Sequence, residues 1–264
     1  MRLTENRYSH DIRFEELRRS GFTVLAGVLD STELQRCRVA IDALLATQAE
    51  SFAHDELESI GELDIVRAPL VDDDFFLFSV ALAPAVLDLV QHVVGEYCLL
   101  HLQNAIVNRP DRAHHQSSWH RDLPYLDRVS SAPLALSALF CIDEFSVNTG
   151  ATTCIPGSHL VADPPPEAFL ARHCLSMEAG AGDVIVFDSM LLHRAGANQS
   201  ANPRRGVNNV YSVGIIRQQI DLPLAMEGRH ADDPSLAIFL GYASNAPASA
   251  EEYRLRRLRR LGSA

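Results

Sequence analysis

The feature that most constrains this chain is a change of pattern near residue 97. Before it, long stretches such as 31–48 carry apolar residues at the spacing of amphipathic helices. From Tyr97 to Ile220 the apolar runs are short, rich in Val, Ile and Phe, and interrupted by Gly, Pro, Asn and Asp. Such runs are typical of the strands of a sandwich or barrel. Helices first and strands afterwards predict an α+β fold, mainly β in its core, with helices packed outside an antiparallel core.

The same patterns place the individual elements. Asp30, with Glu33 three residues later, has the form of a helix N-cap for the stretch Ser31 to about Gln48. We expect one domain over residues 1–264. Its expected parts are a helical N-terminal part at about 11–95, a core at about 97–220 and a helical extension at about 221–264. Further helices are expected at 74–80 and 84–94, and strands at 21–29, 99–107, 134–142, 183–188 and 207–216.

Composition excludes several classes of protein. All 23 basic residues are arginine, so lysine-dependent Schiff-base, pyridoxal-phosphate, Walker-loop and protein-kinase chemistry is absent. The net charge of -11 argues against nucleic acid as a partner, because phosphate binding needs a basic face. Five cysteines without a Cys-x-x-Cys pair indicate a reduced, cytoplasmic protein, and no apolar run is long enough for a membrane span.

The C-terminal stretch from Tyr253 to Leu261 is an exception to the acidic balance, because it is rich in arginine. Leu255, Leu258 and Leu261 recur there every three residues. We interpret this stretch as a terminal helix that is either solvated or packed through its leucines on the body of the protein. Contact with a membrane or an acidic partner is the less favoured interpretation.

Metal-binding chemistry is first indicated at His120-Arg-Asp122. On a strand, residues two apart face the same side, so both side chains would point into a barrel interior. With one more histidine they would form the 2-His-1-carboxylate set of non-haem Fe(II) oxygenases. The pair alone is weak, since composition gives about 0.8 such matches by chance, and His230-Ala-Asp232 is a second one.

The first pair gains weight from two residues downstream of it. His193 comes 71 residues after Asp122, at the end of the apolar run Val184–Phe187, and Arg204 lies 11 residues beyond that histidine. An arginine inside a barrel can hold a carboxylate through two parallel hydrogen bonds. No histidine comes after His230 to complete a second set of the same kind.

Several ordered blocks together resemble the phytanoyl-CoA dioxygenase family of Fe(II)/2-oxoglutarate oxygenases, over roughly residues 12 to 245. The blocks are Trp119-His-Arg-Asp122, Asn148 to His159 with its Pro-Gly-Ser-His ending, Gly182 to His193, His193 to Ser200, and Pro203-Arg-Arg205. Their order is far more specific than any single block. The resemblance implies a double-stranded β-helix, a jelly-roll or cupin-like fold.

The resemblance also implies a site and a reaction. His120, Asp122 and His193 would bind Fe(II), and Arg204 would bind the distal carboxylate of 2-oxoglutarate, with Arg205 as the alternative. The enzyme would use O₂ to hydroxylate an unactivated C–H bond, with release of succinate and CO₂. An aspartate in the ligand set favours hydroxylation over halogenation. Desaturation, cyclisation and epimerisation remain alternatives, as does a non-catalytic metal-binding or sensing role.

The substrate is expected to be a small or medium metabolite, amino-acid-like or a natural-product precursor, and the oligomeric state is left open. His114 and His115 are expected in a loop over the mouth of the site. His159 is expected to fix a turn. The candidate substrate-binding residues are Gln103, Asn108, Trp119, Arg121, Tyr125 and Asn208.

Overall fold

The computed structural model describes residues 12–110, 112, 115–126 and 129–262. Within these residues, nine strands form the core. They are β1 (Phe22–Leu25), β2 (Ile65–Arg67), β3 (Leu99–Asn108), β4 (Ala135–Cys141), β5 (Thr153–Cys154), β6 (Leu175–Ser176), β7 (Val184–Asp188), β8 (His193–Arg194) and β9 (Arg204–Ser212).

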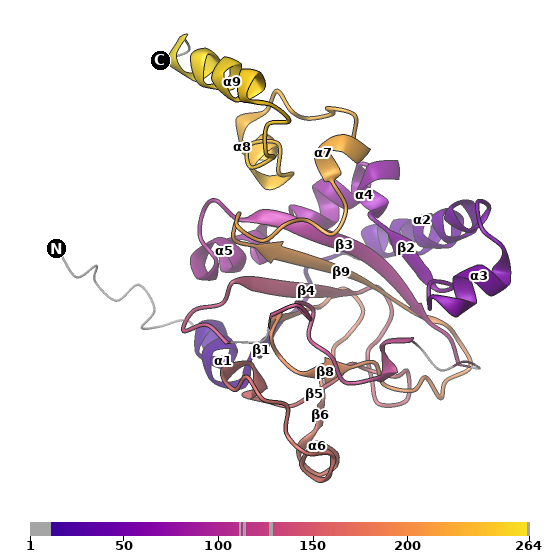
Figure 1. The fold of residues 1–264 in the computed structure, drawn as a ribbon. Helices are drawn as coiled ribbons and strands as arrows, with labels where there is room; N and C mark the ends of the chain where they lie inside the picture. Colours follow the sequence, from indigo (N-terminus) through magenta and orange to yellow (C-terminus); the bar gives the residue numbers. More distant parts are fainter. Residues whose placement is uncertain (1–11, 111, 113–114, 127–128, 263–264) are drawn as a thin grey trace.

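The strands form two antiparallel sheets that face each other (Figure 1). The larger has the order β1-β7-β4-β9-β3-β2 and the smaller the order β6-β5-β8. Apart from β2 and β3, neighbouring strands in the larger sheet are not consecutive in sequence, and from β6 to β9 the chain alternates between the two sheets. This is the double-stranded β-helix, and the fold expected from the sequence is confirmed.

Helices cover the outside of the larger sheet. The helices of the N-terminal part of the chain are α1 (Ile12–Ser20), α2 (Ser31–Ala49), α3 (His54–Ser59), α4 (Pro69–Asp72), the π-helical η1 (Phe76–Ala81) and α5 (Pro84–Val93). Between the strands lie η2 (His115–Ser117), η3 (Ser158–Leu160) and α6 (Glu167–His173). The C-terminal segment holds α7 (Leu222–Ala225), α8 (Pro234–Phe239) and α9 (Ala250–Gly262).

The main hydrophobic core lies between these helices and the outer face of the larger sheet. Ile41 of α2 and Val86 of α5 belong to one buried cluster with Leu100 and Tyr211 of the sheet. The Tyr211 hydroxyl donates to the carbonyl of Ala81, at 2.9 Å, which ties β9 to η1. The α2 helix begins with the expected capping box, in which Asp30 and Glu33 accept each other's backbone N–H groups.

The inner face of the larger sheet holds polar side chains. Asn104 of β3 lies opposite Asn208 of β9, and Asn108 lies opposite Arg204. Because successive side chains point to opposite faces of a sheet, these four share one face, while Arg205 and Tyr211 lie on the other. This alternation decides which residues reach the interior of the barrel.

Two local expectations about the histidines were wrong. His120 makes only an isolated bridge with His193, and Asp122 lies in the turn just after it, so they do not share a continuous strand. His193 does not end β7 but opens β8, after a turn over residues 189–192. The turn after β7 carries the chain from the larger sheet to the smaller one. A strand period of two does not predict the position or direction of such a turn.

The C-terminal arginine-rich stretch forms α9, as expected, and two of its leucines remain exposed to solvent. Leu255 and Leu258 are 46% and 64% exposed. Among the described residues, no helix is both long and apolar enough to span a membrane.

Candidate metal centre

Two histidines and one aspartate meet between the two sheets. One ligand atom from each of His120, Asp122 and His193 lies within 4.8 Å of the others. The Asp122 Oδ1 atom is 3.5 Å from Nε2 of His193 and 4.0 Å from Nε2 of His120. Ligands at right angles on metal bonds of about 2.1 Å would lie about 3 Å apart, so a small inward shift would complete such a set.

Backbone pairing brings the three residues together. The N–H of His120 donates to the carbonyl of His193 at 2.9 Å, and the N–H of His193 donates back at 3.0 Å. The N–H of Asp122 donates to the carbonyl of Ser189 at 3.0 Å. The aspartate is therefore fixed to the turn after β7, while the histidines are fixed to each other.

Backbone carbonyls also set which nitrogen each histidine turns to the centre. Nδ1 of His120 contacts the carbonyl of Ser118 at 2.9 Å, and Nδ1 of His193 contacts that of Leu191 at the same distance. A carbonyl accepts but cannot donate, so each Nδ1 carries a proton and each Nε2 offers its lone pair. This is the usual outer support of a metal-binding histidine.

The second carboxylate oxygen of Asp122 is held by the protein itself. Ser137 Oγ donates to Oδ2 at 2.6 Å, and Asn208 Nδ2 donates to the same atom at 3.2 Å. Oδ1 therefore remains as the oxygen that faces the two rings. The amide of Asn208 is oriented by this bond, and its buried Oδ1 has no hydrogen-bond partner among the described residues.

The electrostatics of the centre favour positive charge. Burial raises the pKa of the Asp122 carboxyl, but the His193 ring and the hydrogen bonds lower it more, so that the net shift is downward. Burial lowers the pKa of His193, whereas the Asp122 charge raises it, with a net upward shift. A carboxylate and two lone pairs facing one point are a donor set suited to a divalent metal, and these residues fit one.

Arg204 lies in the same cavity without an acidic partner. Its side chain is buried, its Nε has no hydrogen-bond partner, and no described carboxylate pairs with it. Its guanidinium carbon lies 3.9 Å from the centroid of the Phe145 ring. Burial lowers the pKa of Arg204 to about 10, and even so the group is a cation at neutral pH. A buried cation of this kind is costly unless an anion joins it.

Arg205 has a different role, because it points out of the barrel. Its guanidinium pairs with Asp42 of α2 at 2.8 Å and with Asp143 at 3.2 Å. Of the two arginines considered from the sequence, the structure therefore brings Arg204 to the metal centre and uses Arg205 to attach α2 to the sheet.

The cavity between the ligands is small, with a volume of about 30 Å³. The cavity is lined by Ile106, Gln116, His120, Asp122, Leu139, Thr152, Phe187, His193, Ala195, Arg204 and Asn208.

Of the candidate substrate-binding residues, Asn208 borders this cavity, and two others turn away from it. Gln103 lies on the outer face of β3, where it accepts from the N–H of Leu70 and donates to the carbonyl of Phe76. Arg121 donates to the carbonyls of Val161 and Ala162 and so supports the loop after η3. The placement of Gln103 and Arg121 at the site was therefore wrong.

The remaining candidates lie at the edge of the site or outside it. Asn108 donates to the carbonyl of Gly196, at 2.9 Å, and thereby holds the loop after β8. The guanidinium carbon of Arg194 lies over the ring of Trp119, 4.7 Å from the ring centroid. Tyr125 is 60% exposed.

Among the described residues, the other histidines considered from the sequence are not part of the ligand set. His115 opens η2, whose Gln116 borders the cavity, and His114 lies outside the described residues. His159 is buried against the Arg18 carbonyl. His230 pairs instead with Asp74.

Sequence reasoning missed Ser137, Gln116 and Thr152, which contact Asp122 or border the cavity. Ser137 carried a weak signal, because it is a lone hydroxyl in the apolar run Leu134–Ile142. Gln116 lies in the short helix η2 and Thr152 in a loop, and no periodicity in the sequence marked either residue.

A double-stranded β-helix that holds two histidines and an aspartate, with open positions beside them, defines the non-haem iron oxygenase class. Residues 17–206 match the family model described as phytanoyl-CoA dioxygenase. The chain belongs to this family, as its sequence blocks indicated.

Individual relatives agree with this membership. An uncharacterized protein of Mycobacterium tuberculosis is 32% identical over 259 residues, covering 94% of this chain and 93% of the relative. A dioxygenase of Aspergillus fumigatus is 26% identical over 210 residues, covering 74% of this chain and 64% of the relative.

Solved structures share the fold. The epimerase SnoN from nogalamycin biosynthesis, in complex with Fe³⁺, α-ketoglutarate and nogalamycin RO, has a TM-score of 0.59 and 22% identity. The match covers 76% of this chain and 82% of SnoN. HygX from Streptomyces hygroscopicus, with nickel and 2-oxoglutarate bound, has a TM-score of 0.59 and 19% identity, and the match covers 80% of this chain and 90% of HygX.

Proposed function

We propose that this chain is an Fe(II)/2-oxoglutarate-dependent oxygenase that hydroxylates a C–H bond of a small metabolite in the cytoplasm. His120, Asp122 and His193 would hold the iron, and Arg204 would bind the distal carboxylate of 2-oxoglutarate. One observation carries the proposal: the metal-binding set shares its cavity with a buried cation that has no acidic partner among the described residues. A cosubstrate that offers a carboxylate supplies what that cation lacks.

The chain's own residues would prepare the reaction. Iron and 2-oxoglutarate together supply the oxidising chemistry that breaks an unactivated C–H bond. The two Nδ1–H···O=C contacts fix both imidazole rings, and the Ser137 hydroxyl fixes the carboxylate. The apolar side chains of Ile106, Leu139 and Phe187 border the cavity and exclude water from it.

The proposal is tested by adding Fe(II) and 2-oxoglutarate under anaerobic conditions. We expect a weak visible charge-transfer band, and succinate release with one member of a metabolite panel. His120→Ala should abolish the band. His230→Ala is the matched control, since it alters the histidine of the second His-x-Asp pair, and it should retain the band. A wild-type protein without band or succinate would refute the proposal.

The product separates hydroxylation from the alternatives. Hydroxylation adds one oxygen atom to the substrate mass, desaturation removes two hydrogen atoms, and epimerisation leaves the mass unchanged. Mass spectrometry of the product from the succinate screen therefore decides the reaction type. We expect the gain of one oxygen. A halogenated product is not expected, since Asp122 occupies the position from which a small residue would admit a halide.

A further inference from the structure

An apolar groove lies between α2, α3 and β2, away from the metal centre. It contains a hollow of about 500 Å³ and a second of about 480 Å³ that shares much of its lining. The side chain of Phe52, between the hollows, is 56% exposed, and Ile60 is 64% exposed. None of the lining residues borders the metal-site cavity. The shared lining consists of Leu45, Ala49, Phe52, Leu57 and Leu63.

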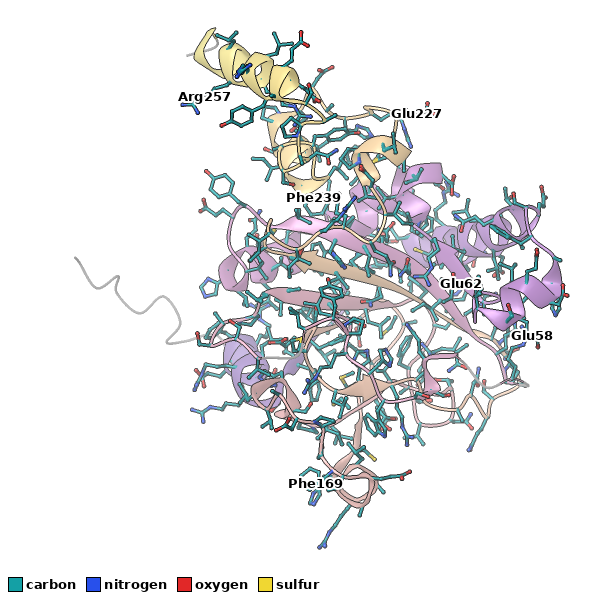
Figure 2. The ribbon with its side chains drawn as sticks, viewed as in Figure 1. Glu58, Glu62, Phe169, Glu227, Phe239 and Arg257 are labelled. Atoms are coloured by element: carbon teal, nitrogen blue, oxygen red, sulfur yellow. The ribbon has the colours of Figure 1, made fainter. Side chains whose placement is uncertain are left out.

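The rim of this groove is acidic. Residues 50–67 contain six acidic residues and one arginine. Arg67 pairs with Glu62, and Arg109 and Arg112, which line the second hollow, both pair with the buried Asp64. Glu50 and Glu58 are exposed. Figure 2 shows Glu58 and Glu62 at the α3 end of the molecule. The groove therefore offers an apolar floor inside a negative border.

The α9 helix has the opposite character. Its range 250–262 contains five arginines and two glutamates. Along it, Leu258 is 64% exposed, Tyr253 53% and Leu255 46%. Arg254 and Arg257 are exposed on the same helix. It thus presents apolar side chains inside a positive border.

These two surfaces cannot meet within one molecule. Figure 1 shows α9 and α3 at opposite ends of the protein, and α9 projects away from the sheets. In Figure 2, Arg257 and Glu58 are correspondingly far apart. Within the part of the chain that the structure describes, no segment covers either the amphipathic helix or the apolar groove of opposite charge.

We propose that α9 of one copy docks into the groove between α2 and α3 of a second copy, and that the exchange is reciprocal. The binding mode is an amphipathic helix in a hydrophobic groove. Because each copy offers both surfaces, a twofold dimer satisfies both at once and closes the assembly. The arginines of α9 also offset the repulsion between two chains that each carry a net charge of -11.

The competing partner for α9 is an anionic membrane surface. A basic amphipathic helix can lie on such a surface. A bilayer would cover α9 but leave the groove unfilled, whereas a second copy covers both surfaces. This difference favours a second copy of the chain.

Sedimentation velocity of the full chain over a wide concentration range tests the proposal. We expect a monomer–dimer equilibrium, weakened at least about tenfold by Leu255→Glu/Leu258→Glu and by Phe52→Glu. The matched control is Leu224→Glu on α7, which alters a leucine that is 76% exposed elsewhere, and it should leave the equilibrium unchanged. Circular dichroism of each variant verifies that it is folded.

A charge exchange identifies the two surfaces as each other's partners. Glu50→Arg/Glu58→Arg makes the groove positive, and Arg254→Glu/Arg257→Glu makes the helix negative. Each variant alone should be monomeric where the wild type is dimeric, whereas an equimolar mixture should dimerise, since both contacts then join opposite charges. A wild type that stays monomeric, a mixture that stays monomeric, or binding of the wild type to phosphatidylserine vesicles in place of dimerisation would overturn the proposal.

Discussion

Ser137 on β4 donates a hydrogen bond of 2.6 Å to Oδ2 of Asp122 and thereby keeps that oxygen away from the two histidines. The bond leaves Oδ1 as the single carboxylate oxygen directed at the metal position, 3.5 Å from Nε2 of His193. A ligand that uses one oxygen occupies one coordination position, which leaves the others open for a cosubstrate. The hydroxyl is therefore a support of the metal centre.

Removal of this hydroxyl should weaken metal binding. We expect Ser137→Ala to lower the affinity for Co(II), a spectroscopic substitute for Fe(II), by about 10- to 100-fold. Titration followed by Co(II) absorption measures the affinity without any substrate. Ser212→Ala is the control, since Ser212 is a buried serine on β9 whose hydroxyl has no partner among the described residues. Equal affinities for the two variants would remove Ser137 from this role.

Arg204 and its neighbour Arg205 should differ sharply in their effect on cosubstrate binding. Arg204→Met removes the cation beside the metal centre, and we expect the KM for 2-oxoglutarate to rise by at least about 30-fold. Arg205→Met removes the ion pairs with Asp42 and Asp143 and should lower stability without changing that KM by more than about twofold. Succinate release at varied 2-oxoglutarate concentration measures both. An equal rise in the two variants would contradict the assignment.

The sequence was sufficient for the fold class and for singling out four side chains that lie together in the structure, because both depend on local patterns. Short strand-like runs after residue 97 predicted the β-rich core, and ordered blocks singled out His120, Asp122, His193 and Arg204. The structure brings these four side chains to one cavity. Local patterns could be used here because each of the four residues lies in or beside a short, distinctive block of the chain.

The direction of individual side chains could not be predicted in the same way. Both faces of β3 are buried, so polarity does not distinguish the inner Asn104 from the outer Gln103. A register shift between Leu100 and Leu102 adds to the ambiguity. Arg121 lies between two metal-ligand candidates in the sequence. Its side chain nevertheless points away from them and donates to the backbone carbonyls of Val161 and Ala162. These placements depend on tertiary contacts that no local period encodes.

Gly150 is expected to be essential for the loop beside the metal centre. Its φ of +77° lies in the left-handed region, and a Cβ atom there would come within 2.7 Å of the Gly196 carbonyl oxygen. Gly150→Ala should therefore cost more than the conformational penalty alone. Gly27→Ala is the control, because Gly27 has a φ of +63° and nothing within 4 Å of such a Cβ. We expect about 1–2 kcal/mol for the control and a larger loss for Gly150→Ala in urea unfolding. Equal losses would exclude a steric contribution.

Asp188 should make the stability of the protein decrease as the pH rises. Burial raises its pKa from 3.8 to about 6, against a smaller opposing effect of the Met190 N–H and the Arg121 charge. The folded state thus holds this proton more tightly than the unfolded state does. The resulting stabilisation is complete below the unfolded pKa of about 3.9 and is lost as the pH rises through about 6.

Asp188→Asn keeps an acceptor for the Met190 N–H but removes the buried charge. We expect the variant to match the wild type near pH 4 and to exceed its unfolding free energy at pH 8 by up to about 3 kcal/mol. Urea unfolding at both pH values measures the difference, in which other titrating groups cancel. Asp163→Asn, which removes an exposed carboxylate, controls for the change in net charge. A gain of the same size at both pH values would show that the buried charge of Asp188 is not its source.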